Sequence, residues 1–541
     1  MDADFVIIGG GTAGCVLANR LSADSRLQVF VLEAGDEATS PWIAMPAGVA
    51  RLFHHPRLNW RYRTEPEQAL GGRRLYWPRG KVLGGTSSIN GMTFVRGQAA
   101  DYDSWSSLTA GAWSWRTVLP YFKRLEDSPF GTRELRGTGG PLRIDRVRNR
   151  HPLSEAFLQS SVAAGVKEND DYNGATQDGI GYTQAMMRDG IRSSAASAYL
   201  APVRSRPNLR VLTRSLVRRI IVEDGRAVGV EFERRRRVET IRARREVLLC
   251  GGTIASPQLL LLSGIGDARA LAALDIPVRV DRPAVGRNLQ EHVRVQLLYR
   301  TRVPSFNRDA RGVRLLAQVA RYVAQRQGLL AVTASQVNGF VRSSPEVERP
   351  DLQLVFRPSS GEYAERHYVV HDYQGVMAMV GLLRPKSRGH IALRSADPRA
   401  APVIVVGHLS DAADYEPLIR GVALIRRIFA TPPLSEHVTE EVRPGKQVDD
   451  DATLRAYIRD TADSLYHAVG TCAMGASVDS VTTPEFAVRG VAGLRVVDAS
   501  VMPRVPSGNT TAAVLMIAER ASDLILGRQS VTELESAGAL A

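Results

Sequence analysis

Residues 4–35, DFVIIGGGTAGCVLANRLSADSRLQVFVLEAG, decide the fold of this chain. The run FVII is continuously apolar, which is typical of a parallel strand that is covered on both faces. It leads into Gly9-x-Gly11-x-x-Gly14 and a helix-like segment, and a second strand-like run ends at Glu33. This order of strand, glycine-rich turn, helix and strand predicts a Rossmann-like α/β domain that binds an ADP-containing dinucleotide.

The residues of this motif have separate physical tasks. Gly9 permits the tight turn, Gly11 lets the backbone approach a pyrophosphate, and Gly14 allows the helix to pack closely on the strand. Free N–H groups at the helix N-terminus attract the phosphates. Glu33 lies 19 residues after Gly14, where its carboxylate can accept hydrogen bonds from both ribose hydroxyls. The motif by itself fits NAD and FAD equally well.

The composition is that of an ordinary globular protein. The chain has 541 residues, of which 44% are hydrophobic and 23% charged, which is enough for about two or three domain-sized units. Its 3 cysteines are widely spaced, which favours neither a disulfide framework nor a zinc cluster and fits a reducing compartment. We expect no signal peptide and no transmembrane segment, because no apolar run approaches about 20 residues. A cytoplasmic location follows, with peripheral attachment to the inner membrane left open.

The net charge raises the question of nucleic-acid binding. The formal charge is +14, and residues 234–237 read RRRR. Nearly all the positive charge is arginine, however, and it is scattered among acidic residues. The RRRR run lies between two strand-like segments, as it would at the exposed end of a hairpin. We therefore expect no nucleic-acid partner, and a basic binding protein remains a minor alternative.

Three further landmarks follow the dinucleotide motif. A second glycine-rich cluster, 80-GKVLGGTSSINGMTFVRG-97, offers a backbone surface that suits a flat ring system. Next come 252-GTIASPQLLLLSGIG-266, His467 within YHAVGTCAMG, and 493-GLRVVDASVMPRVPSGNTTAAVLMIAER-520. In these segments and their order the whole chain resembles the glucose–methanol–choline (GMC) family of FAD-dependent oxidoreductases, and in particular its choline dehydrogenase-like branch.

The resemblance implies a cofactor, a reaction and a set of contacts. It implies FAD, oxidation of a primary alcohol to an aldehyde, transfer of the electrons to a quinone or another acceptor, and no need of a metal. Val217 would contact the adenine through its backbone, and Trp60 is expected to line the cofactor. The full set of residues that we expect to bind FAD is Gly9, Gly11, Thr12, Ala13, Gly14, Glu33, Ala34, Trp60, Val82, Gly85, Thr86, Asn90, Gly91, Met92, Thr93, Val217, Tyr466, Asp498, Ala499, Asn509 and Thr510.

Two departures from the family pattern matter. Some members attach the flavin covalently through a histidine at the position of Ile89, so we expect noncovalent FAD here. Several choline-active members carry Asp-His-x-Glu after the second signature, where the last carboxylate holds the trimethylammonium group. This chain has Glu291-His292-Val293-Arg294. A cation in place of the carboxylate repels another cation, so the sequence favours a neutral or anionic alcohol over choline.

His467 and Asn509 are the residues that the resemblance assigns to catalysis. Oxidation of an alcohol requires that a base take the hydroxyl proton while a hydride leaves the carbon for flavin N5. His467 is expected to accept that proton, and the Asn509 amide to donate to the substrate oxygen. Asn509 is also expected to open and cap the helix-like run that Gly527 ends. His292 is either structural or directed into the pocket, and Tyr466 packs on the flavin, on the substrate or in the core.

The landmarks require discontinuous domains, because the dinucleotide motif and His467 lie at opposite ends of the chain. We expect an FAD-binding domain of residues 1–149, 193–295 and 466–541, to which strands near 205–255 return as a small sheet. An α+β substrate-binding domain of residues 150–192 and 296–465 would build the pocket wall from an antiparallel sheet that includes DLQLVFR, GVMAMVGLLRP and GHIALRS.

One close alternative, an oxidase, and one minor alternative, a lyase, remain open. An oxidase would pass the electrons from an aryl, furan or pyridine carbinol to oxygen and release H2O2. A family lyase would keep FAD without redox use. The identity of the alcohol and the oligomeric state cannot be read from the sequence.

Overall fold

The dinucleotide-binding motif forms the centre of a seven-stranded sheet. A computed structural model describes residues 1–363 and 368–528. Strand β1 (Asp2–Ile8) pairs in parallel with β2 (Val29–Leu32), and helix α1 (Thr12–Leu21) connects them. From its second residue onward β1 is buried, as its continuous apolar run predicts.

Strands from the middle and the end of the chain complete this sheet. The order is β10-β2-β1-β13-β12-β11, and β26 pairs in parallel with β13. The expected small sheet near residues 205–255 is not separate. Strand β13 pairs in parallel with β1 through its C-terminal half and antiparallel with β12 through its N-terminal half. One long strand therefore joins the dinucleotide-binding strands and the β11–β12 hairpin into a single sheet. The bounds are β10 (Leu209–Leu212), β11 (Ser215–Glu223), β12 (Arg226–Arg234), β13 (Arg237–Leu249) and β26 (Leu494–Val496).

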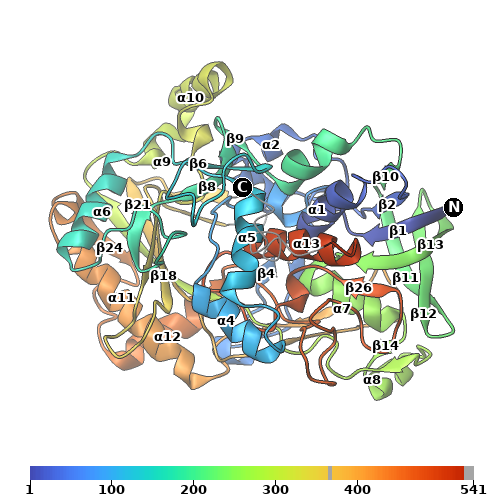
Figure 1. Ribbon diagram of the computed structural model, residues 1–541. Helices are drawn as coiled ribbons and strands as arrows, with labels where there is room; N and C mark the ends of the chain where they lie inside the picture. The colour runs from blue at the N-terminus through green and yellow to red at the C-terminus, as the bar shows by residue number, and fades with distance from the viewer. Residues whose placement is uncertain (364–367, 529–541) are drawn as a thin grey trace.

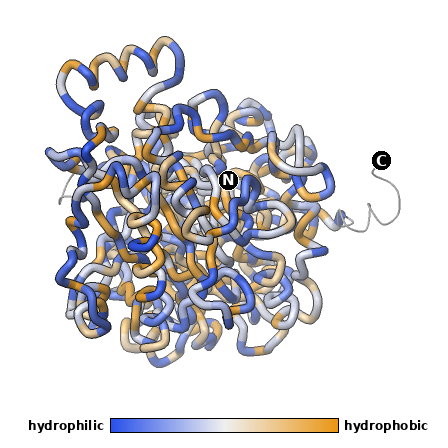
Figure 2. The backbone as a smooth tube through the Cα atoms, turned by 90° about the vertical axis from the view of Figure 1, so that its left-hand side faces the viewer, coloured by the Kyte–Doolittle hydropathy of each residue, from blue (hydrophilic) through white to orange (hydrophobic). Residues whose placement is uncertain are grey.

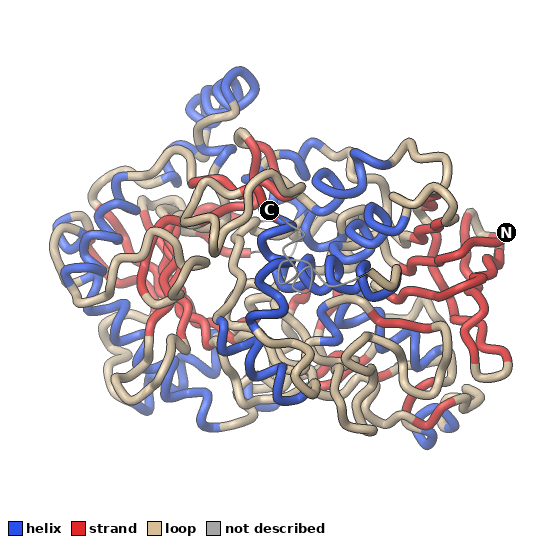
Figure 3. Tube along the Cα trace, in the orientation of Figure 1, coloured by secondary structure: helices blue, strands red, loops and turns tan. Residues whose placement is uncertain are grey.

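A second seven-stranded sheet is antiparallel throughout and lies at the other end of the molecule, as Figure 3 shows. Its order is β24-β16-β21-β18-β17-β7, with β25 beside β16. The run GHIALRS is not part of it, because β22 pairs only with β23 in a two-stranded sheet. The bounds are β7 (Gly179–Tyr182), β16 (Val293–Thr301), β17 (Val337–Val341), β18 (Leu352–Arg357), β21 (Gly375–Leu382), β24 (Val438–Arg443) and β25 (Asp463–Ser464).

The two faces of this second sheet carry different side chains, because successive residues of a strand point to opposite faces. Apolar residues at alternate positions pack against helices on the outer face, among them Leu354 and Val380. The residues between them, such as Gln353 and Met379, line the cavity described below. The outer helices are α6 (Pro152–Ala163), α11 (Tyr415–Phe429) and α12 (Asp451–Thr461), at the left of Figure 1.

The C-terminal helix α13 (Thr511–Ile525) packs against α1, which brings the two ends of the chain together (Figure 1). The buried Glu519 carboxylate on α13 forms ion pairs with Arg20 on α1 at 2.7 Å and with Arg124 at 2.8 Å. We propose two discontinuous domains with the boundaries given above, except that β16, which begins at Val293, belongs to the second sheet over its whole length. This division is supported by the separate apolar cores of the two large sheets.

The other elements are shorter and surround these two sheets. The helices are α2 (Pro41–Ala44), α3 (Val49–Leu52), α4 (Ala99–Leu108), α5 (Trp115–Leu125), α7 (Gly252–Leu262), α8 (Ala268–Ala272), α9 (Phe306–Asp309) and α10 (Gly312–Gln325). The strands are β3 (Tyr62–Arg63), β4 (Tyr76–Trp77), β5 (Glu126–Asp127), β6 (Leu142–Arg146), β8 (Gln184–Arg188), β9 (Ile191–Arg192), β14 (Ile265–Gly266), β15 (Val280–Asp281), β19 (Gly361–Tyr363), β20 (Tyr368–Val370), β22 (His390–Ala392) and β23 (Val403–Val405). No helix in the described part of the chain is long and apolar enough to cross a bilayer.

Candidate active site

One cavity of about 880 Å³ connects the dinucleotide motif to His467 and the second sheet. This volume lies near the upper end of the range of about 300–1,000 Å³ that is typical of ligand pockets. Most of the residues expected to bind FAD line it: Gly9, Gly11, Thr12, Ala13, Glu33, Ala34, Trp60, Gly85, Thr86, Asn90, Gly91, Met92, Thr93, Val217, Tyr466, Asp498, Ala499, Asn509 and Thr510. Gly14 and Val82 lie behind this lining. Val82 is fully buried in a small apolar cluster that includes Leu58 and Ile89.

The backbone around the motif is packed too closely for side chains. A Cβ atom at Gly14 would lie 1.9 Å from the carbonyl oxygen of Gly9, so the helix can approach the strand only with glycine there. Gly9 has a φ of +100°, which also favours glycine. The Glu33 carboxylate accepts from Gly10 N–H at 2.9 Å and Gly35 N–H at 2.7 Å. Burial raises the pKa of Glu33 to about 7, and these bonds oppose the shift.

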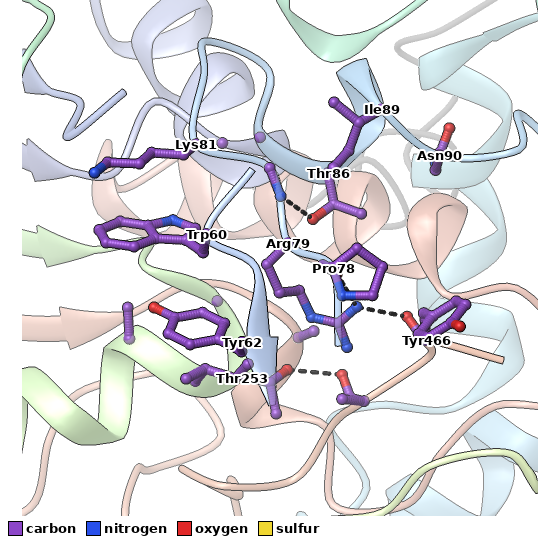
Figure 4. Close-up of a pocket in the computed structure, with 18 of the residues that line it drawn as sticks. Trp60, Tyr62, Pro78, Arg79, Lys81, Thr86, Ile89, Asn90, Thr253 and Tyr466 are labelled. Carbon is purple, nitrogen blue, oxygen red and sulfur yellow. Dashed lines mark hydrogen bonds between the residues drawn. The ribbon is translucent and has the colours of Figure 1, made fainter. Parts of the chain in front are cut away.

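Figure 4 shows the aromatic and cationic wall beside this region. The rings of Trp60 and Tyr62 are stacked with centroids 5.7 Å apart, and the Lys81 ammonium lies 4.5 Å from the centroid of Trp60. The Arg79 guanidinium projects between them and Tyr466, and it donates to the Tyr466 carbonyl at 3.1 Å. Its partner charge is Glu291, 3.8 Å away. This wall therefore presents ring faces and positive charge to a flat anionic ligand.

His467 is fixed at three points. Its backbone N–H donates to the Glu291 carboxylate at 2.6 Å. Its Nδ1 lies 2.9 Å from Nδ1 of His292, and its Nε2 lies 2.8 Å from the Asn509 amide nitrogen. The Nε2 of His292 lies 3.0 Å from the Leu383 carbonyl oxygen. The structure thus brings together the two residues expected to be catalytic, and it adds His292 as a direct neighbour.

These contacts determine which nitrogen atoms carry protons when both imidazoles are neutral. A carbonyl oxygen can only accept, so His292 must carry its proton on Nε2 and donate it to Leu383. The Nδ1 of His292 is then bare and must accept from Nδ1–H of His467. The Nε2 of His467 is consequently bare as well, and the Asn509 amide donates to it. His467 and Asn509 both line the cavity, and Nε2 of His467 carries no proton of its own in this arrangement.

Burial keeps both imidazoles neutral. It lowers the pKa of His467 well below its usual value, and the nearby His292, Arg79 and Arg294 act in the same direction. Burial also lowers the pKa of His292 to about 4. At neutral pH both rings are therefore uncharged, and the chain of proton positions described above applies.

A polar network on the second sheet orients Asn509. Gln353 donates from its amide nitrogen to the side-chain oxygens of Asn338 at 3.0 Å and Asn509 at 3.2 Å. This leaves the Asn509 amide nitrogen directed at His467. Helix α13 begins at Thr511 with Thr510 as the preceding residue, so Asn509 is not its N-cap. The side-chain oxygen of Gln353 is buried without a hydrogen-bond partner and lies in the cavity lining, where a ligand can donate to it.

Arg294 lines the cavity, as the sequence indicated, but its charge is not free. Its guanidinium donates to Asp463 at 2.7 Å and to the Ser464 carbonyl at 3.0 Å. The repulsion of a cationic substrate is therefore weaker than an isolated arginine would give. Arg357, which also lines the cavity, donates to the Ala334 carbonyl at 2.6 Å and forms no ion pair with a described carboxylate.

Sequence reasoning missed Arg79, Glu291, Gln353 and Arg357. The strand DLQLVFR carried a signal for two of them, because its alternation separates Gln353 and Arg357 from the apolar positions. Arg79 and Glu291 had no such signal, because they lie far apart in the sequence and meet only in the folded chain.

Comparison with known proteins identifies the family. The family model for the N-terminal part of GMC oxidoreductases matches residues 3–294, and the model for the C-terminal part matches residues 385–518. The chain belongs to the GMC oxidoreductase family. It is 43% identical over 540 residues to an oxygen-dependent choline dehydrogenase of Sinorhizobium fredii, covering 98% of this chain and 96% of the relative. It is 40% identical to an alcohol dehydrogenase [acceptor] of Pseudomonas putida, covering 98% and 97%.

A solved structure shows the same fold over nearly the whole length of this chain. The crystal structure of pyridoxine 4-oxidase from Mesorbium loti has a TM-score of 0.89 at 30% identity, covering 97% of this chain and 100% of that one. The predicted α/β architecture, the enzyme class and the cofactor FAD are thereby confirmed. The residues at the site fit FAD. The glycine-rich motif at residues 9–14 leaves room for a dinucleotide against the backbone, and this space and His467 belong to the same cavity.

Proposed function

We propose that this GMC oxidoreductase oxidises a primary alcohol to an aldehyde, with Nε2 of His467 accepting the hydroxyl proton. The single observation that carries the proposal is the position of His467 in the cavity lining, with its Nε2 2.8 Å from the Asn509 amide nitrogen. FAD, when bound, supplies a hydride acceptor at its N5 position. The dinucleotide cradle holds its phosphates and ribose, and the 85–93 segment lies along the same cavity.

His467 and Asn509 would both contact the substrate oxygen, one as a hydrogen-bond acceptor and the other as a donor. The alcohol O–H takes the place of the Asn509 amide at the single lone pair of Nε2 of His467, and the displaced amide donates to the alcohol oxygen instead. His467 gains a proton on Nε2 while Nδ1 keeps its bond to His292. The Asn509 donor stabilises the negative charge that develops on oxygen as the proton leaves. Noncovalent binding of FAD remains part of the proposal, because Ile89 cannot form a bond to it.

The free energies favour transfer of the proton together with the hydride. An alcohol with a pKa of about 16 lies roughly nine units above an ordinary histidine, which corresponds to about 12 kcal/mol. The lowered pKa of His467 widens this gap. A turnover of about 10 s⁻¹ allows a total barrier of about 16 kcal/mol. A fully formed alkoxide would use most of it, so we propose that the proton moves as the hydride departs.

For the substrate we propose a neutral or anionic alcohol. The named relatives act on choline, on alcohols and on pyridoxine, so the family tolerates different pockets. Here the sheet face of the cavity carries Arg294, which is paired with Asp463, and Arg357, which forms no ion pair with a carboxylate of the described residues. A cationic alcohol finds no free carboxylate among the described residues of this face. The carboxylate of an ω-hydroxy acid would meet the positive charge of Arg357, and the ring of an aryl carbinol would meet the aromatic side chains that line the cavity.

Anaerobic mixing with alcohols tests the proposal. We expect neutral or carboxylated primary alcohols to bleach the flavin absorbance near 450 nm faster than choline does. Absence of bleaching by every primary alcohol in the panel would overturn the assigned reaction. Admitting air afterwards separates the acceptors, because reoxidation within milliseconds to seconds indicates an oxidase. Slow reoxidation supports electron transfer to a quinone or another carrier.

A further inference from the structure

Helix α10 (Gly312–Gln325) stands away from the rest of the molecule. It projects from the top of the body in Figure 1 and again in the turned view of Figure 2. One narrow side faces the protein, where Tyr322 is buried and donates to the Gly190 carbonyl at 3.2 Å. Gln318 lies on the same side and accepts from Leu329 N–H at 2.9 Å. The remaining circumference of the helix is exposed.

The outward side of α10 is apolar. Residues 313, 316, 320 and 323 recur at the spacing that places side chains on one face of a helix. Val313 is 81% exposed, Leu316 is 69% exposed and Val323 is 67% exposed. Ala317, Ala320 and Ala324 lie between them, so no polar group interrupts the surface. We call this surface the α10 face. The α10 face is contiguous along one side of the helix and contains three of the most exposed large apolar residues in the described part of the chain.

Positive charge flanks the α10 face. Residues 310–328 contain four arginines and no acidic residue. Arg314 and Arg321 lie on one side of the helix, about a third of a turn from the apolar centre. Arg326 directly follows the helix, and its guanidinium carbon lies 5.1 Å from the centroid of the Tyr322 ring. These three arginines form no ion pair with a carboxylate of residues 1–363 or 368–528, so their charges are available to a partner.

We propose that α10 docks this enzyme on an anionic lipid surface, with the α10 face buried between the acyl chains. A short helix with one apolar face, arginines beside it and little net hydrophobicity is the pattern of an interfacial helix. The arginines can extend to the lipid phosphates while their stems remain apolar.

A second copy of the chain fits the same face less well. Antiparallel pairing of two α10 helices about a twofold axis would place the arginine side of one copy beside the arginine side of the other. The apolar area is also on the order of a few hundred Å², against about 800 Å² per partner in a stable interface. A membrane needs no such area, because lipids adapt to the helix and supply the opposite charge.

The docking helix is connected to the substrate cavity. Residues 326–335 run from the end of α10 to Ala334 and Ser335, which line the cavity. Docking would therefore hold the cavity wall beside the lipid phase, in which quinones dissolve. This last point rests on the electron acceptor in the proposed function, whereas the docking itself does not.

Cosedimentation of the FAD-loaded enzyme with lipid vesicles tests the proposal. The probes are vesicles of phosphatidylglycerol and phosphatidylcholine at equal amounts, and vesicles of phosphatidylcholine alone. We expect binding to the anionic vesicles that weakens with added salt. The double variant Leu316→Glu/Val323→Glu should bind at least tenfold more weakly. Replacing Arg314 and Arg321 with glutamine should weaken binding to the anionic vesicles by about fivefold per arginine.

The matched control is Val478→Glu, which places the same charge at another highly exposed valine, and it should bind like the wild type. All variants should retain flavin, melting temperature and alcohol oxidation with a soluble dye. Failure of the wild type to bind anionic vesicles would overturn the proposal, as would undiminished binding by the double variant. A wild-type dimer in analytical ultracentrifugation that this variant converts to a monomer would instead make the α10 face a dimer contact. Dye-linked activity reports separately on the proposed reaction.

Discussion

Replacing His292 with phenylalanine should slow alcohol oxidation without changing what touches the substrate. The ring of His292 accepts the Nδ1 proton of His467 at 2.9 Å and is itself oriented by the Leu383 carbonyl at 3.0 Å. Phenylalanine keeps the volume but offers no acceptor. His467 then either buries an unsatisfied N–H, at a cost of about 1–3 kcal/mol, or moves that proton to Nε2. In the second form it cannot take a proton from the alcohol.

The size of the effect follows from this cost. If the competent form is disfavoured by about 1–3 kcal/mol, its population falls about 5-fold to 150-fold, and the rate falls with it. The assay is single-turnover reduction of the flavin in an anaerobic stopped-flow instrument. We expect the limiting rate to fall within this range and KM to change little. His292 acts here as a positioning residue.

The conservative variant His292→Asn provides the control. An asparagine side chain places its oxygen near the position of Nδ1, so it can still accept from His467 and should restore part of the rate. Flavin content and melting temperature show whether each variant folds. A His292→Phe enzyme that folds, binds FAD and reduces it within twofold of the wild-type rate would refute the reasoning. Equal losses in both variants would also count against it.

Four further outcomes are expected. First, kcat/KM should stay level at neutral pH and fall only below pH 6.5, because the pKa of His467 is depressed and the neutral ring is the active form; an acid limb above 6.5 would contradict this. Second, Asn509→Leu should lower the rate of flavin reduction by about 10²-fold through loss of one donor; an unchanged rate would count against its role. Third, Gly14→Val should lose bound flavin, seen as a lower 450 nm to 280 nm absorbance ratio, because even a Cβ would lie 1.9 Å from the Gly9 carbonyl oxygen. Fourth, acid precipitation should release all the flavin, since Ile89 offers no point of attachment; flavin that stays with the pellet would indicate a covalent bond.

The dinucleotide-binding part of the fold could be predicted because its constraints are local. Gly9 and Gly14 are required by backbone contacts a few residues away, and the buried strand before them is apolar on both faces. The hairpin end at residues 234–237 is likewise local, and the structure places the turn there, because β12 ends at Arg234 and β13 begins at Arg237. Features that depend only on residues close together in the chain can therefore be predicted from a single sequence.

Other features depend on distant partners and could not be predicted. The sequence does not show that β13 joins two parts of one sheet, since each half pairs with a different strand. It also left His292 undecided between a structural role and a pocket role, because its partner is the main-chain carbonyl of Leu383. The sequence also could not show that the charge of Arg294, on which the argument against choline was based, is paired with Asp463. The two residues lie 169 positions apart in the sequence and meet only in the folded chain.

The most direct test of the central claim is reduction of the flavin by alcohol in His467→Ala under anaerobic conditions. The enzyme that retains FAD, melts like the wild type and binds the alcohol should show almost no bleaching at 450 nm, because the acceptor for the hydroxyl proton is gone. Bleaching at close to the wild-type rate in that variant would contradict the assignment of His467 as the base.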